Sequence, residues 1–285
     1  MGSFKQLLIR HSAKVYRNLE PRLDECLRYL RQEGLFDAGR CAIVDMGWHG
    51  TMQLSLHRLL KSAGNPAELF GFYYGLWPKA SGNRYATGPM ESSFASDFLP
   101  TEEQPEIWLG VPLLEQLHSA AHGSTLFYQT GVADGITRPI FQDSPAELKQ
   151  HTQHTFWFQQ GAIEGVKRLF SKDGSLPLCP EDLSRDASLA AMDALFLSPT
   201  VEEIKLLAQI GHCATFDHSG HEPIISVELP TARTHRTIMF DRSEWKLGQL
   251  RLWWHIANAE QKEWIRRAAS ERLGYLGERV LRQFT

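Results

Sequence analysis

The segment from Cys41 to Gln53, CAIVDMGWHGTMQ, constrains the fold of this chain more than any other. Its first part, Cys41–Val44, is a short, unbroken apolar run with β-branched residues, which is typical of a central strand in a parallel sheet. Two glycines follow, and from Met52 to Leu60 apolar residues recur at helical spacing. The segment therefore predicts a buried strand that runs through a glycine-bearing turn into a helix.

A second apolar run, Leu69–Leu76, follows the turn sequence Gly64-Asn65-Pro66 and predicts a second strand. Strand, helix and strand within about 35 residues form a βαβ unit, in which the strands are parallel. The sequence thus predicts an α/β fold with a short parallel, Rossmann-like sheet and a large, mostly helical C-terminal part. We expect an α/β ligand-binding core with a helical lead-in over residues 1–145, and a mostly helical region over 146–285 packed on it, or one continuous domain.

The remaining elements are expected from local patterns. Helical spacing predicts a lead-in from Leu7 to Leu35, in which Pro21 can start a second helix. The stretch from Pro78 to Pro105 is rich in Gly, Ser, Pro and acidic residues, and predicts a long loop or lid. We also expect a helix at Ile107–His118, a hairpin of Thr125–Tyr128 and Ile136–Phe141, helices at Leu148–Phe170, Leu183–Phe196 and Val201–Ile210, a β-like run at Ile224–Leu229, and helices over Ser243–Phe284 that bury Trp245, Trp253, Trp254 and Trp264.

Charge, cysteine content and hydropathy exclude several classes of protein. The formal net charge is −3 and the basic residues are dispersed except in the last helix, so nothing indicates nucleic-acid binding. The 4 cysteines lack a paired CxxC spacing, which fits a reducing compartment. No stretch approaches the roughly 18 apolar residues of a transmembrane helix, and the N-terminus lacks the features of a signal peptide. We expect a cytoplasmic protein that partners can hold at the inner face of the membrane.

The turn between the first predicted strand and helix is the candidate site. Ligands of open α/β sheets bind at the carboxyl ends of the strands, where this sequence places Asp45. The helix N-terminus offers backbone N–H groups to an anion, and Gly47 and Gly50 would let a phosphate approach closely. Thr51 can cap the helix or hydrogen-bond the anion, and Gln53 completes the predicted phosphate-binding set. The pattern matches neither the Walker loop nor the dinucleotide fingerprint.

Two side chains in the turn favour a ligand. Trp48 and His49 stand beside the glycines, and an empty turn has little need of an indole and an imidazole there. Asp45 could orient a sugar hydroxyl, bind a metal or take a proton. His49 could act as a base or donate a hydrogen bond to a phosphate. The alternative is that the glycines only permit a tight turn and that Asp45 or Thr51 is an ordinary cap.

The strings VDMGWHGTMQ and FGFYYGL, with the later VPLLEQLHSAAHGSTLFY, resemble the C-terminal region of large proteins described as predicted hydrolases of the haloacid dehalogenase-like superfamily. The resemblance covers roughly Leu23–Gly161. It implies a role in bacterial capsule, O-antigen or rhamnan-type polysaccharide synthesis, often beside glycosyltransferase domains. The nucleophile motif of that superfamily is DxDx[TV], whereas Gly47 stands two residues after Asp45 here, so the second acid is missing.

Two further clusters carry chemistry-bearing side chains. Glu115 and His118 share a helix face, with His122 just beyond. They are either a solvated polar stripe or acid/base and nucleotide-holding groups that face the Gly47–Thr51 turn. The loop from His212 to Glu222 holds several possible zinc ligands, but its spacing matches no standard zinc site and its composition is that of a polar loop. We assign no metal ligand, and a divalent metal is the one cofactor left open.

These observations lead to one hypothesis and two alternatives. The chain is expected to bind a sugar phosphate or nucleotide-sugar and to act as a glycosyltransferase-like enzyme on a polysaccharide acceptor, with Asp45, His49 and Glu115 as catalytic candidates. The first alternative is a phosphohydrolase of haloacid dehalogenase-like type. The second is a non-catalytic scaffold that docks other domains of a larger biosynthetic protein. Thermal-shift screening would separate ligand binding from scaffolding.

Overall fold

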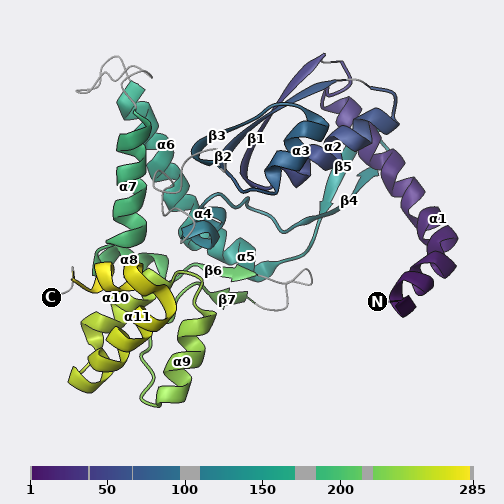
Figure 1. The fold of residues 1–285 in the computed structure, drawn as a ribbon. Helices are drawn as coiled ribbons and strands as arrows, with labels where there is room; N and C mark the ends of the chain where they lie inside the picture. Colours follow the sequence, from purple (N-terminus) through teal and green to yellow (C-terminus); the bar gives the residue numbers. More distant parts are fainter. Residues whose placement is uncertain are drawn as a thin grey trace. The chain divides into compact units, whose positions relative to one another are not determined.

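The computed structural model describes residues 2–37, 39–65, 67–96, 110–170, 184–213 and 221–282 (Figure 1). The chain forms two compact units. The first unit comprises Met1–Phe98 and His122–Asp143, and the second unit comprises Leu99–Ala121 and Ser144–Thr285. The segment around Glu115 therefore belongs to the second unit, although it lies between two stretches of the first.

A parallel sheet forms the centre of the first unit. Its strands are β1 (Arg40–Trp48), β2 (Glu68–Leu76) and β3 (Met90–Ser96), in the order β1-β2-β3. Helix α2 (Thr51–Ser62) connects β1 to β2, and α3 (Ala80–Thr87) connects β2 to β3. All neighbouring strands pair in parallel. The predicted α/β fold with a short parallel sheet and a mostly helical remainder is confirmed.

Residues along β2 alternate between buried and more exposed positions, and the buried Leu69 packs against α2. Leu69, Gly71 and Tyr73 are buried, whereas Glu68, just before them, and Phe72, between Gly71 and Tyr73, are exposed. On the buried side, Leu69 packs with Leu60 of α2 and with Cys41 and Ile43 of β1. This is the period of two that a strand requires when one of its faces is covered by helices.

Helix α2 ends where the sequence supplies a glycine. Gly64 has a φ of 77°, and the N–H of Asn65 donates to the carbonyl of Leu60 at 3.0 Å. The N–H of Gly64 donates to the carbonyl of Lys61 at 3.1 Å. These two bonds are those of a Schellman motif, in which a left-handed glycine ends the helix. The chain can then turn directly into β2.

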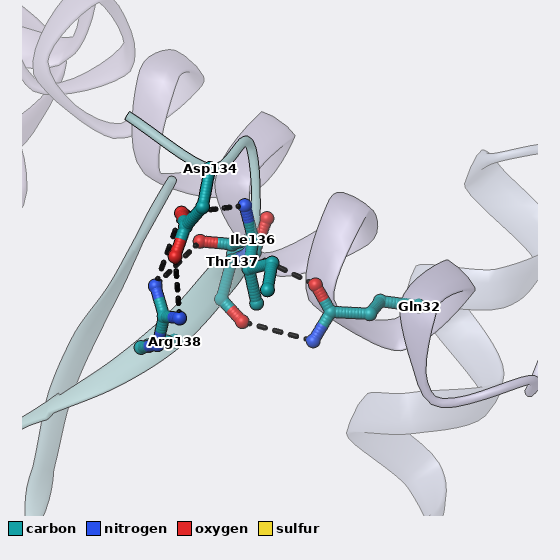
Figure 2. Close-up of polar contacts among 5 residues, drawn as sticks. All are labelled: Gln32, Asp134, Ile136, Thr137 and Arg138. Atoms are coloured by element: carbon teal, nitrogen blue, oxygen red, sulfur yellow. Dashed lines mark hydrogen bonds and ion pairs between the residues drawn. The ribbon is translucent and has the colours of Figure 1, made fainter. Parts of the chain in front are cut away.

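A long helix and a hairpin complete the first unit. Helix α1 (Gly2–Gln32) contacts the antiparallel pair β4 (Thr125–Thr130) and β5 (Thr137–Phe141), which confirms the predicted hairpin. Figure 2 shows how the Gln32 side-chain amide pairs with the backbone of Thr137. Its Nε2 donates to the Thr137 carbonyl at 3.0 Å, and its Oε1 accepts from the Thr137 N–H at 2.9 Å. Gln32 thus pairs with the edge of β5 as a neighbouring strand would.

The second unit is mostly helical in the part of the chain that the structure describes. Its elements are α4 (Val111–Leu117), α5 (Pro145–Gln150), the π-helical turn η3 (His151–Thr155), α6 (Phe156–Phe170), α7 (Arg185–Leu197), α8 (Val201–Leu207), β6 (Gly211–Cys213), β7 (His221–Pro223), α9 (Arg233–Arg242), α10 (Lys246–Ile256) and α11 (Ala259–Arg282). Its core includes Phe240, Leu250, Trp253 and Ile265. Trp245 is fully buried and donates from its indole to the carbonyl of Phe196 at 3.2 Å.

Some predicted elements were wrong. The expected loop at 78–105 contains α3 and β3, with residues 97–105 outside the described ranges. Pro21 lies inside α1 and starts no second helix. The run at 224–229 forms no strand, and the short strands of that region, β6 and β7, lie before it. Helix α9 had no counterpart in the prediction.

Candidate functional site

The turn between β1 and α2 leaves the start of the helix uncapped. Gly50 is the N-cap residue, in the left-handed conformation with φ 64° and ψ 22°, and no side chain caps the helix. The first helical bond runs from the N–H of Leu54 to the carbonyl of Gly50 at 3.1 Å. Helix geometry leaves the preceding N–H groups without an acceptor in the helix, and Thr51 and Met52 are exposed. Thr51 is the first helical residue and not the cap.

Contacts within the protein explain both glycines of the turn. Gly47 has a φ of 131°, and a Cβ added to it would lie 2.3 Å from the carbonyl oxygen of Gly75. A Cβ on Gly50 would lie 2.6 Å from the sulfur of Met90. Only glycine fits either position without movement of its neighbours. The alternative interpretation, that these glycines permit a tight turn, accounts for them without a ligand.

Gln53 is a structural residue in the first turn of α2. Its side chain is 0% exposed, and its Nε2 donates to the carbonyls of Leu69 and Pro89, both at 3.3 Å. Its Oε1 accepts from the hydroxyl of Tyr73 at 2.9 Å. The amide therefore ties α2 to β2 and to the chain that enters β3. Such burial corrects the phosphate-binding role predicted for this side chain, because a ligand on the surface cannot reach it.

An aromatic cluster lies at the carboxyl ends of β1 and β2. Trp48, 7% exposed, stacks on Trp77 with ring centroids 5.9 Å apart and an interplanar angle of 30°. The imidazole of His49 meets Trp77 edge-on at 5.0 Å. Asn83 of α3 donates to the carbonyl of His49 at 2.8 Å, and the N–H of Trp77 donates to that of Trp48 at 2.7 Å. These bonds hold the turn after β1 against the chain that follows β2. His49 is half-buried and lies at the carboxyl edge of the sheet, which we call the rim.

Trp77 is a site residue that the sequence reasoning missed. It follows β2 directly, just as His49 follows β1. Because the carboxyl ends of parallel strands meet at one edge of a sheet, the residues after the two strands are neighbours in space. The signal was present in the sequence as a tryptophan at the end of the second apolar run.

Asp45 lies within β1, below the rim. The strand continues to Trp48, so the expectation that Asp45 ends the strand was wrong. Asp45 pairs in register with Tyr73 on β2. Burial, and then the charge of Asp45, raise the pKa of the Tyr73 hydroxyl to about 12. The protonated Tyr73 hydroxyl donates to Gln53 Oε1 at 2.9 Å.

The three residues of the second predicted cluster fall into different units. Glu115 lies in α4, and His118 caps the end of that helix with its Nδ1 at 2.8 Å from the Leu114 carbonyl, both in the second unit. His122 belongs to the first unit and stacks on Phe141 with centroids 3.7 Å apart. His122 is thus packed on the hairpin. A role for Glu115 and His118 beside the Gly47–Thr51 turn stays a prediction.

The histidine-rich segment is only partly covered by the structure. His212 and Cys213 lie in β6, and Cys213 pairs with His221 of β7 in the register of the two-stranded sheet. Residues 214–220 lie outside the described ranges. Within those ranges, no three His, Cys, Asp or Glu side chains come together in a way that could hold a metal ion.

Comparison with known proteins gives no further assignment. Neither the family models nor the curated proteins searched match this chain. In the part of the chain that the structure describes, none of the helices has both the length and the apolar character needed to cross a membrane.

Proposed function

We propose that the first unit binds an anionic sugar ligand, a sugar phosphate or nucleotide-sugar, at the carboxyl ends of β1 and β2. The observation that carries this proposal is the uncapped start of α2, which stands beside His49 and Trp77. Backbone N–H groups at a helix N-terminus bind phosphate, and the helix dipole favours its charge. His49 supplies a hydrogen-bond donor at the same rim, and aromatic rings are common walls of ligand sites.

The chemistry that suits this arrangement is transfer of a sugar to a polysaccharide acceptor. Helix N-terminal amides would stabilise the negative charge on a departing diphosphate, and His49 would take the proton of the acceptor hydroxyl. The resemblance of VDMGWHGTMQ to proteins of bacterial polysaccharide synthesis supports this context. Asp45, in the same strand as Trp48, would orient a sugar hydroxyl.

Calorimetric titration of the purified chain with inorganic phosphate, glucose 1-phosphate, UDP and UDP-glucose tests the proposal. We expect at least one of the sugar-bearing anions to bind, and His49→Ala to weaken its binding by about 10-fold or more, because a hydrogen bond to a charged group is lost. His57→Ala changes the same residue type further along α2 and is the matched control. Equal affinity in wild type and His49→Ala, or no binding of any probe, would overturn the proposal.

A non-catalytic docking module is the second candidate, and one observation favours it. Gly47, Gly50 and Gln53 are all explained by packing within the first unit, without a ligand. On this account Asp45→Ala and His49→Ala leave the biological activity of the larger assembly intact. A phosphohydrolase is less well supported, since Gly47 replaces the second acid, and a phosphatase assay with magnesium would detect it.

A further inference from the structure

The first half of α1 has an uneven charge. Between Gly2 and Leu19 the sequence GSFKQLLIRHSAKVYRNL carries Lys5, Arg10, Lys14 and Arg17, and no Asp or Glu. The first acid is Glu20. Arg10, Lys14 and Arg17 follow one another at spacings of four and three residues, so they share a helix face. In the described part of the chain, Lys5, Arg10 and Lys14 form no ion pair.

The same half-helix, with Leu23 one turn beyond it, exposes a stripe of apolar side chains. The exposed fractions are 64% for Ile9, 72% for Tyr16, 50% for Leu19 and 42% for Leu23. Their spacing of seven, three and four residues places them on one face, away from the face of Arg10 and Lys14. Tyr16, Leu19 and Leu23, together with Glu20 and Arg22, line a surface hollow of about 610 Å³. Such a contiguous exposed apolar surface marks an interaction site.

The ring and polar contacts between α1 and the hairpin lie in the second half of this helix. They begin at Arg22, which lies over Phe127, and continue through the stacking of Tyr29 on Tyr128 to Gln32. Among the described residues of the first unit, no such contact involves α1 before Arg22. Figure 1 shows that part of α1 extending beyond β4 and β5.

We propose that the first half of α1 lies on an anionic lipid surface. Its apolar stripe would enter the boundary between head groups and acyl chains, and its basic face would be attracted by the negative surface, which acts over about 10 Å. A second copy packed on the apolar stripe would leave the basic residues without an anionic partner, and a nucleic acid would leave the apolar stripe in water. An anionic membrane uses both the apolar stripe and the basic residues.

Vesicle sedimentation tests this inference with the full chain. The probes are vesicles of 70% phosphatidylcholine with 30% phosphatidylglycerol, and vesicles of phosphatidylcholine alone. We expect at least 10-fold tighter binding to the anionic vesicles at about 0.1 M salt, and release at about 1 M salt, where the Debye length falls to about 3 Å. Equal binding to both vesicles, or binding to neither, would overturn the proposal.

Two pairs of variants assign the binding to α1. Tyr16→Ser with Leu19→Ser, and Arg10→Glu with Lys14→Glu, are each expected to lower vesicle affinity at least 10-fold. The matched controls are Val132→Ser, at an exposed apolar residue of the hairpin turn, and Arg58→Glu with Lys61→Glu on α2. Circular dichroism and melting curves establish that each variant is folded. If the α1 variants bind as wild type does, or instead abolish a concentration-dependent dimer, the inference is wrong.

Discussion

Gly47 occupies a backbone conformation that side chains rarely adopt, with a φ of 131° and the carbonyl of Gly75 at 2.3 Å from where a Cβ would lie. We expect Gly47→Ala to lower the free energy of unfolding by about 3 kcal/mol, from backbone strain and steric conflict together. Urea denaturation measures this. Gly82→Ala, in α3 with no atom near the added Cβ, is the control and should stabilise by up to about 1 kcal/mol. Similar effects at the two positions would contradict this account of the turn.

At the same scale, the sequence predicted the turn but not the roles within it. A strand, glycines and a helix follow one another locally, so their order is readable from residues 41–60 alone. The burial of Gln53 depends on Tyr73 and Pro89, which are distant in sequence and are brought together by the pairing of three strands. Trp77 was missed for the same reason, because its contact with His49 exists only once β1 and β2 are in register.

The turn of the hairpin offers a pH prediction at the scale of the element. Figure 2 shows Asp134 between Arg138 and the N–H of Ile136, with Asp134 Oδ2 2.6 Å from Arg138 Nη2. The hydrogen bond from Arg138, and then that from Ile136, lower the pKa of the Asp134 carboxyl from 3.8 to about 2. The pKa of Asp134 is lower in the folded protein than in the unfolded chain. The ionised Asp134 carboxylate therefore stabilises the fold above pH 3.8, and this stabilisation is lost as the pH falls through about 2.

Carboxyl NMR titration of wild type and Arg138→Ala checks this assignment. The variant loses the first of the two hydrogen bonds, so the pKa of Asp134 should rise toward its ordinary value. Arg22→Ala removes another arginine of the first unit, one that lies over Phe127, and serves as the control. A pKa of Asp134 that stays near 2 in Arg138→Ala would show that the ion pair does not set it.

Elements were predictable where their periodicity was strong. The βαβ unit and the hairpin carry clear apolar runs and turn residues, and both were confirmed. Strand β1 was predicted to be a buried central strand, but it lies at one edge of the sheet as described, and its Val44 is 84% exposed. Strand β3, MESSFAS, lies at the other edge and has no continuous apolar run that would predict a strand. Pro21 was expected to start a helix, but it is exposed within α1, where water can hydrogen-bond the carbonyl that lost its N–H partner.

At the scale of the whole molecule, the chain leaves the first unit after β3 and returns to it at His122. The sequence predicted either a boundary near residue 145 or one continuous domain, because nothing in the composition of residues 99–121 marks them as belonging elsewhere. The same division separates Glu115 and His118 from His122. The proposed ligand site and the proposed lipid-binding helix both belong to the first unit, so each can be tested by variants of that unit.

The most direct test of the proposed site is an NMR titration of the ¹⁵N-labelled chain with UDP-glucose and with glucose 1-phosphate. The account predicts that the largest shift changes occur at the backbone amides of Thr51 and Met52 and at the indole N–H of Trp77, and that His49→Ala weakens them together. Saturating ligand that leaves those amides unmoved, or that shifts only residues outside the carboxyl edge of the sheet, would contradict it.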